Sequence, residues 1–277
     1  MQDDYRVVRL ANGTWSVHSL AERETFHPVI GPVAEAEALY VRQLKLRERV
    51  AAHQGEFVIW DVGLGAAANV LTALRAVRDL NCPLRVVSFD KTIEPLRFAL
   101  AHRDTLEFIA GYESQIEQLI SDGRSDFGLV KWELRLGDFP TLIRGEAALP
   151  APDAILFDAF SPAKNPVMWT APLFKDLHRR LDPARPCVMP TYSRSTMLRV
   201  TLLLAGFYVG VGHATGEKEE TTIASNDLAL LADPLPRSWL ARARRSRSAE
   251  PMWEPVYRQA PLAATTWEAL QHHPQFR

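Results

Sequence analysis

Short apolar runs alternate with amphipathic segments over the middle of the chain, from residue 57 to about residue 231. Runs bounded by Gly, Asp or Pro predict buried strands, and apolar residues at helical spacing predict helices. The predicted strands begin at residue 57, cover 84–89, 130–136, 154–157, 186–191 and 207–212, and include one more within 221–231. The predicted helices cover 69–80, 92–102, 112–122 and 194–205, with one more that ends near residue 181. This alternation predicts an α/β fold with a mostly parallel sheet and helices on both faces. The short polar connection 213–220 predicts that the last two strands are antiparallel.

The first part of the chain, residues 1–55, follows a different pattern. Asn12-Gly13 lies between two alternating runs, which is a hairpin signature, and a long helical pattern covers residues 33–53. We expect this N-terminal extension, a hairpin plus a helix, to pack over one edge of the main domain, residues 56–232. His27 lies in the polar loop between them, where it is either a ligand contact or a loop residue with a backbone partner.

The C-terminal tail, residues 233–277, is basic and rich in Pro. Its arginines are Arg237, Arg242, Arg244, Arg245 and Arg247, and Trp253 and Tyr257 follow between prolines. Arginines near aromatic residues suit RNA phosphates and bases. A solvated helix followed by a strap packed on the domain explains the same pattern, and both interpretations stay open.

Composition limits the functional classes. The chain has 277 residues, 47% of them hydrophobic and 23% charged, with a net charge of −1, so no global positive field attracts nucleic acid. Cys82 and Cys187 have no CxxC spacing and are expected to be core residues in a reducing compartment. No apolar stretch is long enough to span a bilayer, and the N-terminus is polar. We therefore expect a cytoplasmic protein with no membrane contact.

A glycine turn follows the first buried strand of the main domain. The segment Asp61-Val62-Gly63-Leu64-Gly65 leads into a helix that begins near Asn69. Glycines let the backbone approach a ligand, and the free N–H groups of a helix N-terminus face it. The spacing differs from the dinucleotide fingerprint and resembles the first motif of S-adenosylmethionine methyltransferases, in which Asp61 would face the cationic end of the cofactor. A purely structural turn is the alternative.

Acidic residues end several predicted strands, and the carboxyl ends of parallel strands are where open α/β sheets bind ligands. Asp90 is the candidate for a ribose diol and Asp138 for an adenine amine, although each also suits a helix cap. Asp158 is the candidate for the reaction centre, because a carboxylate near the methyl group can steer an amine and take its proton. The predicted cofactor residues are Asp61, Gly63, Gly65, Asn69, Asp90, Lys91 and Asp138. The predicted substrate residues are Phe160, Lys164, Asn165, Trp169 and Lys218, with plain core as the alternative for Trp169.

One long run carries a family resemblance. It is Asp158-Ala159-Phe160-Ser161-Pro162-Ala163-Lys164-Asn165-Pro166-Val167-Met168-Trp169-Thr170. This run resembles the signature of the bacterial tRNA 5-methylaminomethyl-2-thiouridine (wobble uridine) methyltransferases, and the resemblance extends over about residues 57–225. It implies a Rossmann-like class I fold with a seven-stranded sheet. It also implies S-adenosylmethionine as cofactor, methyl transfer to the aminomethyl nitrogen at C5 of a wobble uridine in the tRNA anticodon loop, and Asp158 as general base.

Some features depart from the family pattern. Ala67 stands where many methyltransferases have a third glycine, and the loop with Glu217, Glu219 and Glu220 is acidic where family members tend to be basic. Many members carry a fused flavin oxidoreductase domain, and this sequence has no second Gly-rich cradle. We therefore expect a stand-alone methyltransferase, with a separate flavin oxidoreductase or other enzymes making the aminomethyl uridine precursor.

Two other functions remain open at this stage. The same fold and Asp158 suit a methyltransferase or aminopropyltransferase acting on another amine, in a small molecule or a protein. A non-catalytic S-adenosylmethionine-binding or RNA-binding module is the second alternative, although a scaffold has no need for an acid at the reaction centre.

Overall fold

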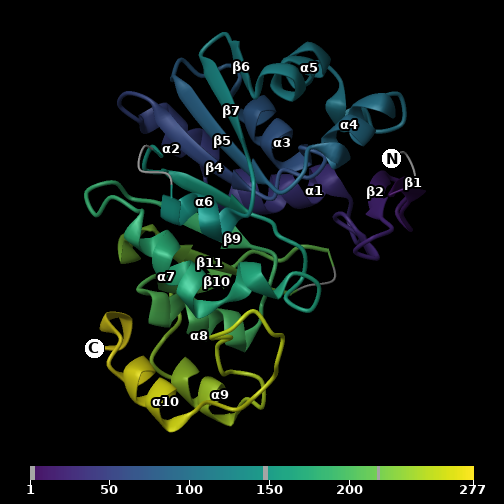
Figure 1. Ribbon diagram of the computed structural model, residues 1–277. Helices are drawn as coiled ribbons and strands as arrows, with labels where there is room; N and C mark the ends of the chain where they lie inside the picture. Colours follow the sequence, from purple (N-terminus) through teal and green to yellow (C-terminus); the bar gives the residue numbers. More distant parts are fainter. Residues whose placement is uncertain (1–3, 146–148, 217–218) are drawn as a thin grey trace.

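The centre of the molecule is an eight-stranded sheet in a computed structural model that describes residues 4–145, 149–216 and 219–277. The strand order is β10-β11-β9-β8-β4-β5-β7-β6 (Figure 1). The strands are β4 (Phe57–Val62), β5 (Leu84–Asp90), β6 (Arg124–Phe127), β7 (Val130–Leu136), β8 (Ala154–Phe157), β9 (Val188–Thr191), β10 (Tyr208–Gly212) and β11 (Thr221–Ser225).

The predicted parallel core is confirmed. β4 pairs in parallel with β5 and β8, β5 with β7, and β8 with β9. The last two strands, β10 and β11, are antiparallel, as their polar connection predicts. The sheet has one strand more than the expected seven-stranded form, because β6 forms an antiparallel hairpin with β7 around Gly128. β6 is only four residues long and has one fully buried side chain, so its apolar pattern is too weak to predict a strand.

Helices cover both faces of the sheet and bury alternate residues of each strand. Phe57 and Ile59 of β4 belong to one core, and Val58 and Trp60 to the other. The first core is covered by α3 (Ala68–Val77), α4 (Glu94–Ala101) and α5 (Glu113–Asp122), and the second by α6 (Phe139–Gly145), α7 (Ala171–Arg179) and α8 (Thr196–Ala205). Short 3₁₀ turns are η2 (Glu107–Ile109), η3 (Pro166–Trp169) and η4 (Leu228–Leu230). Within the described ranges, the helices are too short or too polar to cross a membrane.

The N-terminal region forms a small sheet and a broken helix. The predicted hairpin around Asn12-Gly13 is present as β1 (Tyr5–Arg9) and β2 (Trp15–Ser19), joined by β3 (Glu24–Thr25). The single predicted helix is instead α1 (Pro32–Ala36), the π-helix η1 (Glu37–Gln43) and α2 (Leu46–Ala52). The break before α2 lies at Lys45, whose φ of +48° is left-handed and cannot continue a right-handed helix. Tyr40 of η1 donates to the carbonyl of Phe157 (3.2 Å), which ties this region to the end of β8.

The tail packs beneath α8 and does not lie free (Figure 1). It contains α9 (Trp239–Arg245), α10 (Ala264–Gln271) and η5 (Pro274–Phe276), with Leu240, Ala243 and Leu270 buried. Three of its arginines have partners among the described residues: Arg237 donates to the carbonyl of Phe276, Arg242 lies 3.5 Å from Glu220, and Arg244 lies over the Trp267 ring. The packed-strap interpretation therefore holds for these contacts, whereas Trp253 and Tyr257 remain exposed.

A buried ion pair aligns the two strands that lead to the predicted reaction centre. Asp153, just before β8, accepts two hydrogen bonds from Arg185, at 2.6 Å each, and one from the amide of Val58 in β4 (2.7 Å). The Asp153 side chain is only 4% exposed, so its carboxylate depends on these donors.

Replacing Arg185 by Met should lower the free energy of unfolding by on the order of 3 kcal/mol, because it leaves Asp153 buried without its cation. Urea unfolding followed by circular dichroism measures this. The matched control is Arg47→Met, which breaks the exposed pair with Asp79 and should change the midpoint little. Equal midpoints for the two variants would show that the Asp153 pair does not hold the strands.

Candidate active site

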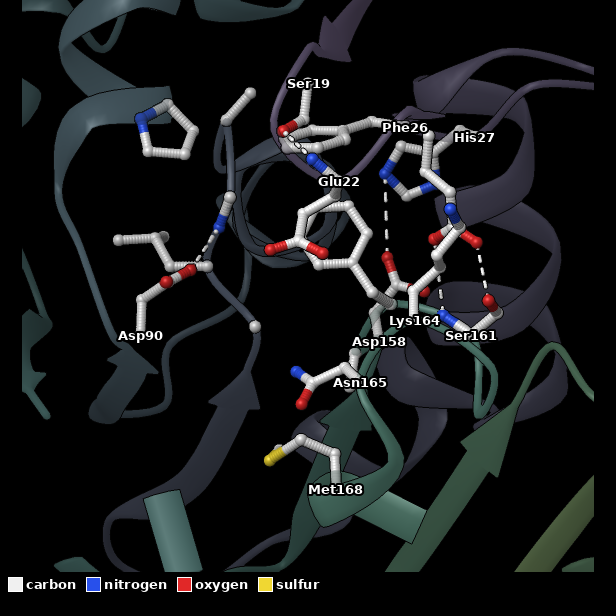
Figure 2. Close-up of a pocket in the computed structure, with 18 of the residues that line it drawn as sticks. Ser19, Glu22, Phe26, His27, Asp90, Asp158, Ser161, Lys164, Asn165 and Met168 are labelled. Carbon is white, nitrogen blue, oxygen red and sulfur yellow. Dashed lines mark hydrogen bonds and ion pairs between the residues drawn. The ribbon is translucent and has the colours of Figure 1, made fainter. Parts of the chain in front are cut away.

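A cavity of about 620 Å³ opens at the carboxyl ends of β4, β5 and β8. Its other wall is the N-terminal segment 19–29, which crosses over the strand ends. Asp90 lies on one side of the cavity, and His27 and Asp158 lie on the other (Figure 2). The predicted ligand edge of the sheet is therefore a real cavity, closed in part by a region far away in sequence.

Close contacts and left-handed backbone angles both require glycine in the turn after β4. Gly63 has φ +94°, and a Cβ at this position would lie 2.8 Å from the carbonyl oxygen of Asp158. Gly65 has φ +52°, and a Cβ there would lie 3.1 Å from the Phe26 ring. Ala67 also adopts a left-handed conformation, with φ +67°, at the point where α3 begins. The turn thus presses against both the loop after β8 and the N-terminal segment.

Asp90 holds the glycine turn from the end of β5. Its carboxylate accepts hydrogen bonds from the amides of Gly65 (2.9 Å) and Thr92 (3.2 Å). Burial raises the pKa of Asp90, while these amide donors act in the opposite direction. The predicted cap toward Thr92 is therefore present, and a carboxylate has acceptor positions left for a ligand in the cavity.

Asp61 lies beneath the turn, fully buried. It accepts a hydrogen bond from Ser88 Oγ (2.7 Å), and Ser88 in turn accepts one from Trp132 Nε1 (2.9 Å). The other oxygen, Oδ1, has no hydrogen-bond partner among the described residues. Burial raises the pKa of Asp61 to about 7, although the Ser88 bond opposes the shift. Asp61 is not one of the residues that line the cavity, so its predicted direct contact with a ligand stays a prediction.

Asp158 is held from several directions at the end of β8. Its amide donates to the carbonyl of Val62 (3.0 Å), and its Oδ2 accepts a hydrogen bond from Asn69 Nδ2 (2.7 Å). His27 Nε2 lies 3.6 Å from the same oxygen. The next carbonyl, of Ala159, accepts a hydrogen bond from the hydroxyl of Tyr192 (3.1 Å). Asn69, predicted to face the cofactor, therefore also contacts the predicted base.

The loop after Asp158 combines wall residues with a buried support. Phe160 packs edge-on against Phe26, with ring centroids 5.5 Å apart. Trp169 is fully buried, and its Nε1 donates to the carbonyl of Phe160 (2.7 Å). Trp169 does not line the cavity, so the plain-core alternative describes its position and it supports the wall from behind.

The structure brings most of the predicted residues together. Those lining the cavity are Gly63, Gly65, Asn69, Asp90, Lys91, Asp158, Phe160, Lys164 and Asn165. Asp138 lies outside the lining, where it pairs with Lys91 (3.7 Å) and accepts a hydrogen bond from Thr141. Lys218 lies outside the described residues.

The sequence predicted that the N-terminal extension packs over one edge of the main domain, with His27 as a possible ligand contact, but it did not single out the other cavity residues of this region. Glu24, Phe26 and Glu35 line the cavity, and Glu24 accepts a hydrogen bond from Ser161 Oγ (2.5 Å) in the loop after Asp158. The only local signal was the polar loop that contains His27. Nothing in its spacing shows that it folds across a sheet edge that begins at residue 57.

Comparisons with known proteins agree with this architecture. Residues 101–227 match the family model described as S-adenosyl-L-methionine-dependent methyltransferase. The "tRNA 5-methylaminomethyl-2-thiouridine biosynthesis bifunctional protein MnmC" of Methylibium petroleiphilum is 29% identical over 239 residues, which are 82% of this chain and 35% of that protein. The protein of the same name from Aeromonas hydrophila is 30% identical over 215 residues, 68% of this chain and 30% of that protein. The chain thus spans about a third of the length of these relatives.

A solved structure matches nearly the whole chain. The crystal structure of MNMC2 from Aquifex aeolicus superposes with a TM-score of 0.72 at 24% identity, over 96% of this chain and 84% of that one. The agreement includes the N-terminal region and the tail, because so little of the chain lies outside it. At this identity the match establishes the fold, and it supports the class I methyltransferase architecture that the family resemblance implies.

Replacing Gly63 by Ala should disrupt the site, because the new Cβ meets the Asp158 backbone. The matched control is Gly55→Ala, which has a similar φ of +85° and no atom within 4 Å of the new Cβ. The control isolates the left-handed strain, about 1–2 kcal/mol. We expect Gly63→Ala to lose more stability in urea unfolding and to lose cofactor binding in calorimetry. Similar losses in both variants would mean that the close contact is unimportant.

Asp61 should make stability depend on pH. Its folded pKa is about 7, above the reference value of 3.8, so between these values the unfolded chain has lost the Asp61 proton while the folded protein retains it, and stability falls until the pH reaches about 7. Relative to Asp61→Asn, the wild type should therefore lose on the order of a few kcal/mol of unfolding free energy between about pH 4 and pH 8. Urea unfolding of both cofactor-free proteins across this range measures the difference. Parallel stability curves would contradict the burial of an ionisable Asp61.

Proposed function

This chain belongs to the S-adenosylmethionine-dependent methyltransferases, and we propose that it methylates the aminomethyl nitrogen at C5 of a tRNA wobble uridine. The observation that carries the proposal is the placement of Asp158. Its carboxylate lies in the cavity, opposite Asp90, and it opens the run of residues that resembles the wobble-uridine methyltransferases. The names of the similar MnmC proteins support the same substrate.

The cofactor side of the cavity is built from β4, β5 and α3. S-adenosylmethionine supplies an activated methyl group when it is bound. Its ribose suits the Asp90 carboxylate, which faces the cavity with acceptor positions to spare. The turn at Gly63 and Gly65 leaves no room for side chains, as a closely approaching ligand requires. Asp61, with its unpartnered oxygen beneath the turn, supplies negative potential below the cationic end of the cofactor.

Three further assignments on this side rest on position alone. Asp138 would approach the adenine amine, and its pair with Lys91 shows that both side chains lie at the same rim. Asn69 lines the cavity between the glycine turn and Asp158. Each is a proposal for the bound state.

Asp158 would perform the proton chemistry. An aminomethyl group is protonated at neutral pH, so a carboxylate attracts it and then accepts its proton, which frees the nitrogen lone pair for the methyl group that the cofactor would supply. The Asn69 hydrogen bond, the Val62 carbonyl contact and the Tyr192 contact at Ala159 keep this carboxylate in a fixed orientation. Fixed orientation matters because methyl transfer is an in-line displacement.

The acceptor side suits a nucleotide. Phe160 and Phe26 present aromatic surface on which a flipped base can stack. Lys164 lines the same wall and can contact a phosphate, and Asn165 can read a base edge. Lys218 is a further proposed RNA contact. Trp169 contributes by supporting the Phe160 backbone.

The partner that makes the precursor is a separate proposal. The similar MnmC proteins are named bifunctional and are about three times as long as the matched region. We infer that a separate flavin oxidoreductase, or the enzymes that make the aminomethyl uridine, precede this chain in the reaction sequence.

The decisive experiment is transfer of tritiated methyl from S-adenosylmethionine to undermodified tRNA, followed by nucleoside analysis. We expect label in 5-methylaminomethyl uridine, and a loss of at least about 100-fold in Asp158→Asn with cofactor binding retained. Asp122→Asn, an exposed carboxylate at the end of α5, is the matched control and should keep full activity.

Two outcomes would contradict the proposal. Absence of label in tRNA, with label in a polyamine or another small amine, would assign the Asp158 site to a different acceptor. Absence of turnover on every amine, with intact cofactor binding, would favour a binding module.

A further inference from the structure

His27 occupies a position between two carboxylates inside the N-terminal wall. Its Nε2 lies 3.6 Å from Asp158 Oδ2, and its Nδ1 lies 3.8 Å from Glu35 Oε1. The side chains of His27 and Glu35 are each 9% exposed, so water screens these charges poorly. Figure 2 shows the His27 ring on the same side of the cavity as Asp158, with one ring nitrogen directed at the Asp158 carboxylate.

The backbone at His27 is in a costly conformation. Its φ is +49°, in the left-handed region, and the next residue is Pro28, which restricts the preceding residue to extended conformations. A non-glycine residue held this way costs of order 1–3 kcal/mol, and Gly or Asn would be easier to accommodate. A histidine at this turn therefore needs a reason in its side chain. The ring contacts with Asp158 and Glu35 provide one.

Two carboxylates flank His27, and the other titratable groups near it are Glu24, Lys164, Tyr40 and Tyr192. Burial lowers the pKa of His27, whereas Asp158 and Glu35 raise it, and the net direction is upward. Glu24 of β3 lies in the same wall. Burial and these carboxylates raise the pKa values of Tyr40, on η1, and Tyr192, after β9, so both remain neutral phenols. In this cluster His27 supplies the positive charge that faces the two carboxylates.

We propose that His27 is a positioning residue for the Asp158 base: as an imidazolium between Asp158 and Glu35, it orients the Asp158 carboxylate and holds segment 19–29 over the cavity. The reaction it serves is the proposed methyl transfer. His27, from the N-terminal wall, and Asn69, from α3, both contact Oδ2 of Asp158, so the carboxylate plane is fixed from two sides. Glu35 lies against the other ring nitrogen, Nδ1, and stabilises the positive charge of the ring next to Asp158.

Kinetics of His27→Gln on undermodified tRNA test the role. We expect kcat to fall by about tenfold to a hundredfold, with cofactor affinity within about threefold of wild type. A carboxylate that loses a neighbouring cation is protonated at higher pH, so the acid limb of the kcat/KM profile should move upward. The matched control is His18→Gln, which removes a histidine of β2 bonded to Thr25 and should change neither value. An unchanged kcat and pH profile in a folded His27→Gln protein would overturn the proposal.

A second measurement needs no acceptor and no change at His27. Nuclear magnetic resonance follows the His27 ring through a pH titration in wild type, Asp158→Asn and Glu35→Gln. We expect the His27 midpoint to fall by about one pH unit or more in each variant. Unchanged His27 midpoints would show that the carboxylates do not hold the ring charged. If tRNA is not methylated but the midpoints fall, the substrate proposal fails and the His27 contact stands.

Discussion

The close approach of two strand ends determines most of this site. The turn after β4 lies directly against the backbone of Asp158 at the end of β8, with no space for a Cβ at Gly63. Parallel pairing of β4 and β8, aligned at their other ends by the Asp153 and Arg185 pair, brings these ends into register. The glycine turn and the Asp158 carboxylate thus become neighbours through backbone geometry, and the side chains only refine their distance.

The site also depends on how three acidic side chains are buried and hydrogen-bonded. Asp61 lies near the end of β4, Asp90 ends β5 and Asp158 follows β8, so all three lie at the same edge of the sheet. Each carboxylate has different hydrogen-bond partners. Asp90 has backbone amides, Asp158 has an amide side chain and an imidazole, and Asp61 has a single hydroxyl. Because solvation and hydrogen bonding set the behaviour of a carboxylate, three identical groups at one edge of the sheet can behave differently.

The sequence contained enough to predict the sheet, its ligand edge and most cavity residues, because apolar periodicity and strand-terminal acids are local signals. It could not show that residues 19–35 form the opposite wall, since that contact joins segments more than a hundred residues apart, such as Glu24 and Ser161. It left open whether Trp169 contacts the substrate or belongs to the core, because spacing shows neither side-chain direction nor depth, and the indole lies behind the wall. The sequence did not predict strand β6, because its four residues are too few to show an apolar periodicity.

The two sides of the cavity come from different stretches of the chain. The side proposed to hold the cofactor is built from β4, α3 and β5, whereas the opposite side comes from segment 19–35 and the loop after β8. The acceptor could therefore change through drift in two peripheral segments, while the sheet and the glycine turn stay as they are. Because the two sides come from separate segments, one sheet can host group transfer to many unrelated amines. The two peripheral segments are therefore the natural place for substitutions that change acceptor specificity.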